Sequence, residues 1–522
     1  MQRARHLLRS SVIVIVLFAL GKLVGLVRAR LVAQAFGTTP QFDAFTAANQ
    51  LPEVFFTVIA GGSLAAAFIP VYSQYLAQDN RAASAQTAAS ARLANTVLTL
   101  VILLLGGISA LGALFAPWLT QHVLVPDFAP ELQQLTAQIM RIILIQTTIF
   151  GIGGVLSSVL NAHQHFTLPA LATIALDIGY FVGLFVFVPR WGIHGLAWGT
   201  VVGGLLFVAI QTPALVRFSL RFRPRLDFRL AGVGEVVRLM GPRIVTLGVI
   251  QLADLFIIRL TSGLPAGATS GYFYGYGLMQ FPQTLFGTAI ALVVFPTLAE
   301  LYNAHDLEGL RRTAGRTLGI IWTLTLPAAA ATVLLGRPII VTLFQGGAFD
   351  AEATQLVYAV LAVFSVRIVS ESTLEVVARL FYARHNTLVP MLTYLGWFAL
   401  TIALSYALVG RLGVVGLALA TTVGFTLLAA VLFELNRRAL GGLGGRALQL
   451  SFARAAVGAT IMAAAIWGVG QVITDTLPFL VIGALVGGVV YVAVTWLLGG
   501  RELQALWAIA RDRTTPSASS AN

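Results

Sequence analysis

Long apolar segments alternate with short polar segments along this whole chain. A helix of roughly 20 apolar residues can cross the hydrocarbon core of a membrane. The pattern predicts about fourteen such helices, at residues 10–36, 44–76, 88–120, 131–161, 167–189, 192–216, 241–264, 268–302, 310–336, 351–384, 387–409, 413–436, 448–473 and 477–499. Several segments exceed one bilayer thickness and contain Gly or Pro, so we expect tilts, kinks or cytoplasmic extensions.

Basic residues gather in alternate loops between these segments. Three arginines precede the first span, six lie at positions 217–238, and others follow the eighth and twelfth spans. Because cytoplasmic loops carry the excess of Lys and Arg, this distribution predicts that both termini are cytoplasmic. The basic stretch 217–240 is expected to form an amphipathic linker helix on the inner leaflet, and 501–522 a polar cytoplasmic tail.

Composition agrees with a membrane protein and excludes several other classes. The 522 residues are 58% hydrophobic with a mean hydropathy of +0.87, too apolar for a protein with a water-exposed surface. The formal net charge is +13, but the basic residues lie between apolar segments, so they indicate contact with membrane lipids rather than with nucleic acid. Without cysteine, a P-loop or metal-binding histidine spacing, the sequence favours a secondary transporter without a bound cofactor over an enzyme.

The two halves of the chain echo each other. The segment "LNAHQHFTLPAL" (160–171) pairs with "FYARHNTLVPML" (381–392), and "GIHGLAWGTVVGG" (192–204) pairs with "GVVGLALATTVGF" (413–425), both at one offset. Six spans per repeat give both halves the same orientation, as in many alternating-access transporters. We therefore predict an all-α polytopic membrane protein with a parallel pseudo-twofold repeat and a substrate site between its lobes. The predicted parts are an N-terminal six-helix lobe (1–216), the linker (217–240), a C-terminal six-helix lobe (241–438), two additional transmembrane helices (439–500) and the tail (501–522).

Charged residues inside the predicted spans are costly unless they face protein or water. In the tenth span, the spacing pairs Arg367 with Glu371 and Glu375 with Arg379 along one helix face. Structural pairing at helix interfaces would explain any one such residue. For the whole set a hydrated cavity is the better interpretation, and its other members are Lys22, Arg28, Glu53, Arg141, Asp177, Asp254 and Arg259.

Four further motifs stand out along the chain. They are "GKLVGLVRARLVAQAFGTTPQFDAFTAANQLP" (21–52), "SGLPAGATSGYFYGYGLMQFPQ" (262–283), "LFQGGAFDAEAT" (343–354) and "ARLFYARHNTLVPM" (378–391). Together they resemble the MurJ/MviN lipid II flippases of the MOP superfamily. The resemblance implies fourteen helices, a central cationic cavity and a location in the bacterial plasma membrane. It also implies passage of an undecaprenyl-pyrophosphate-linked peptidoglycan precursor from the inner to the outer leaflet, driven by the membrane potential or an ion gradient.

The resemblance also implies which residues bind substrate. They would be Lys22, Arg28, Asp43, Arg141 and Arg379, and the acidic cavity residues Glu53, Glu371 and Glu375 are added to this set. The chain also departs from the family pattern, since Phe56 and Thr57 stand where an arginine pair is typical. Glu53 replaces an asparagine, and Glu375 replaces a common lysine.

A sodium site is a further implication of the resemblance. Oxygens of Asp254, Thr401, Ser405 and Thr421 could coordinate Na⁺, although ordinary helix-packing hydroxyls are the favoured interpretation of these residues. Coupling to H⁺ is an alternative.

Three functional hypotheses follow. The first is a flippase for lipid II or for another undecaprenyl-linked glycan. The second is a multidrug-type exporter of cations that uses the acidic cavity residues. The third is a membrane scaffold that partners a cell-wall synthesis complex.

Overall fold

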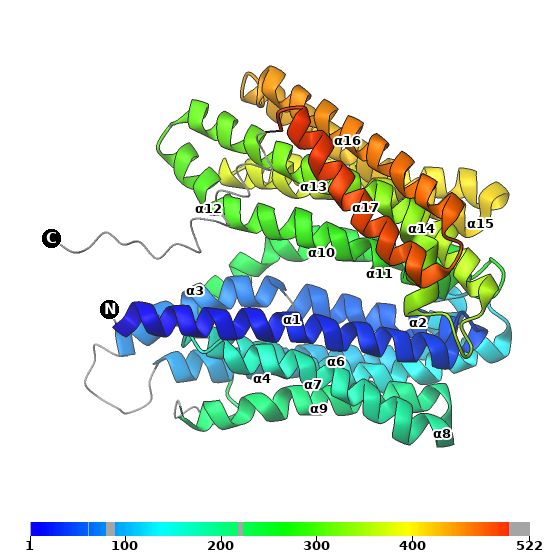
Figure 1. Cartoon of the computed structure of the whole chain (residues 1–522). Helices are drawn as coiled ribbons and strands as arrows, with labels where there is room; N and C mark the ends of the chain where they lie inside the picture. The colour runs from blue at the N-terminus through cyan, green and yellow to red at the C-terminus, as the bar shows by residue number, and fades with distance from the viewer. Residues whose placement is uncertain (1, 61, 80–88, 218–222, 501–522) are drawn as a thin grey trace. The chain divides into compact units, whose positions relative to one another are not determined.

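The computed structural model describes residues 2–500 except 61, 80–88 and 218–222, so the predicted tail 501–522 lies outside the described residues. Within these residues every element is a helix (Figure 1). Contacts divide the chain into two units, residues 1–270 with 346–349 (unit 1) and residues 271–345 with 350–522 (unit 2). The structure confirms the predicted all-helical membrane fold. The predicted lobe boundaries and the substrate site between the lobes concern how the parts are arranged, and they stay predictions.

Eleven helical segments of the described residues are long and apolar enough to cross a membrane. One of them, α15 (Leu388–Ala439), joins the predicted eleventh and twelfth spans and contains a non-helical residue, Gly413. The helices α1 (Gln2–Phe36) and α10 (Ala231–Thr261) are not among the eleven. The predicted count of fourteen therefore stays a prediction.

Unit 1 holds the helices from α1 to α10. After α1 come α2 (Pro40–Phe55), α3 (Gly62–Asp79), α4 (Ala89–Leu114), α5 (Ala116–Leu119), α6 (Pro130–Ala162), α7 (Thr167–Val182), α8 (Val188–Trp191) and α9 (Ile193–Arg217). The π-helical segments η1 (Phe56–Ala60), η2 (Thr120–Leu124) and η3 (Gly183–Phe187) continue α2, α5 and α7. The helix α6 packs against α2, α4 and α9, so it forms the centre of this unit.

Glycines set the closest helix packing in unit 1. A Cβ atom on Gly199 of α9 would lie 2.6 Å from the Cα atom of Gly183, and one on Gly179 of α7 would lie 2.2 Å from the Cα atom of Gly203. These glycines recur every four residues on each side, the spacing that lets transmembrane helices approach closely. The contact fixes α7 against α9 and so positions Asp177 and Tyr180 of α7.

Unit 2 is built on long helices. They are α11 (Ala268–Gln283), whose first residues belong to unit 1, η4 (Thr284–Thr288), α12 (Ala289–Asn303), α13 (Leu307–Leu343), α14 (Ala351–Ala383), α15, α16 (Gly445–Val472) and α17 (Thr476–Leu497). The helix α14 packs against α13 and α15, and Figure 1 shows α16 and α17 alongside α13. Buried Asn436 ties α15 to α14, since it donates to the Val377 carbonyl and accepts from Arg384 Nη2 at 2.6 Å.

Backbone conformations support the predicted duplication. The offset that pairs Pro169 with Pro390 also pairs Gly192 with Gly413, whose φ/ψ values are 54°/−135° and 56°/−136°. The same offset pairs Gln164 with His385, which have positive φ values of 58° and 57°. Such values are uncommon for residues other than Gly. Each half therefore contains two turns whose backbone conformations match those of the other half, so the duplication extends from the sequence to the structure.

The predicted amphipathic linker helix is wrong for residues 223–230, which are not helical. Side chains of α4 hold this segment through its backbone, because the Arg223 N–H donates to Asn95 Oδ1 and the Arg225 N–H donates to Thr99 Oγ1, both at 3.2 Å. Helix begins only with α10 at Ala231. In this segment, backbone N–H groups donate to side chains of a distant helix instead of to carbonyls within a helix of their own.

Candidate functional site

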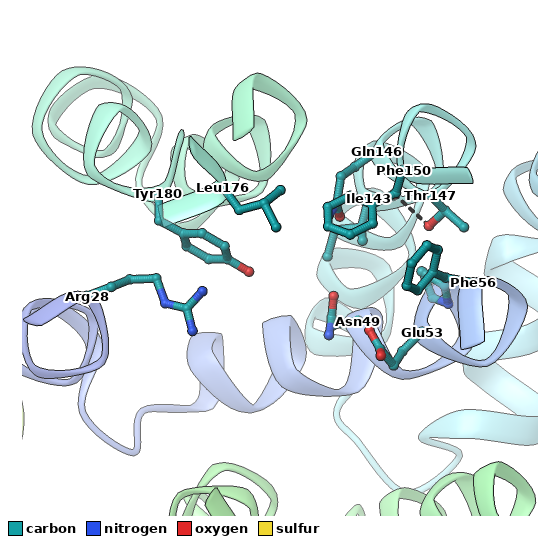
Figure 2. A pocket seen from close by; sticks show the side chains of 11 residues that line it. Arg28, Asn49, Glu53, Phe56, Ile143, Gln146, Thr147, Phe150, Leu176 and Tyr180 are labelled. Atoms are coloured by element: carbon teal, nitrogen blue, oxygen red, sulfur yellow. Dashed lines mark hydrogen bonds between the residues drawn. The ribbon is translucent and has the colours of Figure 1, made fainter. Parts of the chain in front are cut away.

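A pocket of about 290 Å³ lies within unit 1, and we call it the Arg28 pocket (Figure 2). Its walls come from α1, α2, η1, α6 and α7. The lining residues are Arg28, Asn49, Pro52, Glu53, Phe56, Ile143, Gln146, Thr147, Phe150, Leu176 and Tyr180. The pocket thus contains two of the predicted substrate-binding residues, Arg28 and Glu53.

Arg28 supplies the positive charge of this pocket. Its Nη1 atom lies 2.8 Å from Asp177 Oδ1, and its guanidinium lies over the Tyr180 ring, 4.7 Å from the ring centroid. The Arg28 side chain is 36% exposed, whereas that of Asp177 is only 10% exposed. An arginine has five N–H donors, and this ion pair is formed through Nη1, so donors remain for an anionic ligand. The buried carboxylate compensates the charge while the guanidinium stays accessible.

Glu53 supplies a negative charge on another side of the same pocket. In Figure 2, Arg28 and Tyr180 lie apart from Glu53, and Asn49 lies beside Glu53. The Thr57 hydroxyl donates to Glu53 Oε1 at 3.3 Å. Thr57 belongs to the π-helical segment η1, a kind of distortion that recurs at functional sites. The pocket therefore presents charges of both signs.

The remaining lining combines polar, aromatic and aliphatic side chains. Gln146 and Thr147 share one face of α6 with Ile143 and Phe150. The rings of Phe56 and Phe150 meet edge to face, with centroids 4.9 Å apart. Such a lining suits an amphipathic ligand that carries polar groups, and it offers neither a nucleophile with a base nor a metal cluster.

A second charged cluster lies in unit 2, on α14. The predicted pairs are confirmed, since Arg367 Nε lies 2.7 Å from Glu371 Oε2 and Arg379 pairs with Glu375. Gln280 donates to Glu371, and the Thr288 hydroxyl of η4 donates to Glu375. Each carboxylate in this cluster thus has a cation and a further donor.

Arg367 is enclosed by aromatic rings. Its guanidinium lies 3.9 Å from the ring centroid of Phe425 and 5.0 Å from that of Tyr276. The whole residue is only 5% exposed. Cation–π contacts and the Glu371 pair together offset the cost of burying this charge, so Arg367 has a structural explanation.

Asp43 also has a structural explanation. It is 2% exposed and accepts hydrogen bonds from the backbone N–H groups of Gly267 at 2.6 Å and Ser270 at 2.7 Å. These amides belong to the N-terminal end of α11, where N–H groups have no partner within the helix. A carboxylate at this end caps the helix and also favours its dipole.

Lys22 and Arg141 lie outside the Arg28 pocket. Lys22 is an exposed residue of α1. Arg141 Nε donates to the Ala113 carbonyl of α4 at 2.9 Å, close to the point where α4 ends. A guanidinium suits a helix C-terminus, since carbonyls there lack helical partners. A role for either residue in substrate binding stays a prediction.

The predicted sodium ligands divide between the two units. Asp254 belongs to α10 of unit 1, and Thr401, Ser405 and Thr421 belong to α15 of unit 2. Thr401 and Ser405 are fully buried, and their hydroxyls have no hydrogen-bond partner among the described residues, whereas Thr421 donates to backbone carbonyls of its own helix. Within the described part of the chain, no group of three or more His, Cys, Asp or Glu residues could hold a metal. Sodium coordination stays a prediction.

Sequence reasoning missed four polar pocket residues, Asn49, Gln146, Thr147 and Tyr180, although helical spacing indicated two of them. Tyr180 follows Asp177 by three positions, and Asn49 precedes Glu53 by four, so each shares a helix face with a residue already singled out. Gln146 and Thr147 lie on the α6 face described above. Both are neutral, so a search for charged residues in apolar segments does not select them.

Comparisons with known proteins agree with one another. The family model described as lipid II flippase MurJ matches residues 32–495. A probable lipid II flippase MurJ of Bdellovibrio bacteriovorus is 31% identical over 408 residues, which cover 76% of each chain. The lipid II flippase MurJ of Burkholderia cenocepacia is 28% identical, over 79% of this chain and 80% of its own.

Solved structures show the same fold. A structure of lipid II flippase MurJ in an inward closed conformation is similar with a TM-score of 0.79 at 20% identity, covering 93% of this chain and 98% of its own. A multidrug resistance MATE family transporter of the MOP superfamily is similar with a TM-score of 0.67 at 16% identity, covering 81% of this chain and 94% of its own. At these identities the likeness establishes the fold alone.

Proposed function

This chain belongs to the lipid II flippase MurJ family, and we propose that its Arg28 pocket binds the anionic head group of lipid II during transport. The protein is a multi-pass membrane protein and a lipid II flippase, so its substrate is a lipid-linked glycan and its action is transport.

The observation that carries the pocket proposal is the geometry of Arg28. A pyrophosphate linkage is strongly anionic, and moving it through a membrane requires compensating positive charge. Guanidinium binds phosphate oxygens through charge-assisted hydrogen bonds, often two at once. Arg28 is partly exposed and is held in place by Asp177 and Tyr180. It can therefore accept a phosphate without first leaving a fully buried ion pair.

The transport cycle that we propose is alternating access. Lipid II would move from the inner to the outer leaflet of the bacterial plasma membrane, with both termini of the protein cytoplasmic. The membrane potential or a gradient of Na⁺ or H⁺ would supply the free energy. A cell-wall synthesis complex would use the product on the outer side.

Complementation tests this function. We would express the chain in bacterial cells depleted of their own lipid II flippase, beside Arg28→Ala, Lys22→Ala and the control Arg190→Ala, which changes an exposed residue of α8. We expect growth with the native chain and the control, and loss of growth with Arg28→Ala at equal membrane abundance. Lys22→Ala shows whether a cation outside the pocket is also needed.

Two outcomes would contradict the proposal. Failure of a well-expressed native chain to restore growth would exclude lipid II and point to another undecaprenyl-linked glycan. Full growth with Arg28→Ala would leave the family assignment in place but exclude this pocket as the head-group site.

A further inference from the structure

Glu53 is a carboxylate of the Arg28 pocket that forms no ion pair within the described residues. It lines the pocket and is exposed, and its hydrogen bond comes from a neutral hydroxyl, that of Thr57. The carboxylates of the second charged cluster differ, because Glu371 and Glu375 each pair with an arginine. Glu53 thus stands out among the acidic residues that the sequence placed in a cavity.

No basic residue of the pocket lining pairs with Glu53. The lining contains one arginine, Arg28, and its guanidinium pairs instead with Asp177 at 2.8 Å. Figure 2 shows Arg28 and Glu53 entering from separate sides. The first residues of η1, Phe56 and Thr57, are uncharged. One side of the pocket therefore attracts anions and the other attracts cations.

An unpaired carboxylate at membrane depth is costly, and intramembrane ionisable residues commonly mark a ligand or ion path. We propose that Glu53 binds an ammonium group of the transported head group while Arg28 binds its phosphate. The amide of Asn49, beside Glu53 in Figure 2, supplies an oxygen that can share the ammonium donors. The inference rests on the proposed function and adds that the preferred substrate is a lipid-linked glycan whose peptide carries a free amine.

An organic ammonium fits this site better than a bare metal ion. Hard cations such as Ca²⁺ take six or more oxygen ligands, commonly with several carboxylates. Glu53 is the one carboxylate of the pocket lining, and its hydroxyl partner Thr57 donates its hydrogen to it. An ammonium instead needs a few acceptors in fixed directions, which a carboxylate and an amide oxygen provide.

Binding of two forms of lipid II tests the inference. The purified full chain in nanodiscs would be titrated with lipid II that carries its free peptide amine and with the same lipid after acetylation of that amine. The variants are Glu53→Gln, Glu53→Asp, which keeps the charge, and the control Glu131→Gln, which removes the same charge from an exposed position on α6. Size-exclusion profiles and unfolding midpoints establish that each variant is folded.

We expect the native chain and Glu131→Gln to bind the free-amine lipid about tenfold more tightly than the acetylated lipid, a difference of about 1.4 kcal/mol. Charge-assisted hydrogen bonds are of at least this strength. Glu53→Gln should lose the preference while its affinity for the acetylated lipid stays the same. Glu53→Asp should keep a preference for the free-amine lipid. If Glu53→Asp does not fold, the comparison of Glu53→Gln with Glu131→Gln still tests the inference.

Each contrary result has its own meaning. A preference that persists in Glu53→Gln overturns the inference. So does an equal loss of affinity for both lipids, which would indicate a proton or metal-ion site at Glu53. Equal binding of both lipids by the native chain also overturns it but leaves the proposed function standing. If the native chain binds neither lipid, the proposed function fails and this inference fails with it.

Discussion

Replacing Asp43 by Ala should destabilise unit 1 through the amides that it caps. The Asp43 side chain accepts from the N–H groups of Gly267 and Ser270 at 2.6 and 2.7 Å. The residue is only 2% exposed, so water cannot easily replace it. Alanine would leave both buried donors without a partner.

The magnitude follows from these two bonds. A buried donor that loses its partner costs about 1–3 kcal/mol, and loss of a helix N-cap costs about 0.5–2 kcal/mol. Both figures describe the same two contacts, so they are not added together. With two donors left unpaired, we expect Asp43→Ala to lower the free energy of unfolding by about 2–4 kcal/mol. Asp43→Asn keeps one acceptor oxygen, so it should cost roughly half as much.

Hydrogen exchange and thermal unfolding in detergent measure the effect. The amides of residues 267–270 should exchange at least tenfold faster in Asp43→Ala, since each tenfold corresponds to about 1.4 kcal/mol. Asp475→Ala is the matched control, because Asp475 occupies the N-cap of α17 but its exposed side chain forms no capping bond. If Asp43→Ala matched this control in both unfolding midpoint and exchange at 267–270, the capping role would be refuted.

Three further predictions concern other contacts. Gly199→Ala should reduce the folded yield in size-exclusion chromatography, because its new Cβ would lie 2.6 Å from backbone, whereas Gly107→Ala enters open space and should not. Exchanging the charges of Arg367 and Glu371 should lower the unfolding midpoint, since a carboxylate would then face aromatic rings; the same exchange in the exposed pair at the start of α13 should have little effect. Burial lowers the pKa of His163 below its usual value, so unfolding binds a proton and stability should fall as the pH drops below about 6.5. His163→Gln should flatten this pH dependence between about pH 7.5 and 5.5, and an unchanged slope would contradict the assignment.

Features set by local spacing could be predicted from the sequence. The arginine–glutamate pairs of α14 needed only the four-residue period of a helix, and the structure contains both. The duplication followed from one offset, and Gly192 and Gly413 share a left-handed backbone conformation at matched positions. The helical membrane fold could also be predicted, because apolar segments of membrane length are enough to indicate membrane-spanning helices.

Features that depend on tertiary contacts could not be predicted. Nothing near Asp43 in the sequence indicates that backbone amides at Gly267 and Ser270 are its partners. Arg141 resembled a cavity cation, yet it donates to a carbonyl of α4. His163 lies between two predicted spans, where the sequence indicates no partner, but it is half-buried and its Nε2 atom lies 3.1 Å from the Tyr72 hydroxyl. In each case the sequence shows the chemical group and the fold selects its partner.

Translocation of labelled lipid II in proteoliposomes tests the central claim most directly. The purified chain and Arg28→Ala would be reconstituted at equal density, and the fraction of lipid II that becomes accessible on the opposite leaflet would be followed with time. The account predicts transport well above that of empty liposomes for the native chain. It also predicts at least a tenfold lower rate for Arg28→Ala, since charge-assisted hydrogen bonds to phosphate exceed about 1.4 kcal/mol. A native rate no greater than that of empty liposomes, or an unchanged rate in Arg28→Ala, would contradict it.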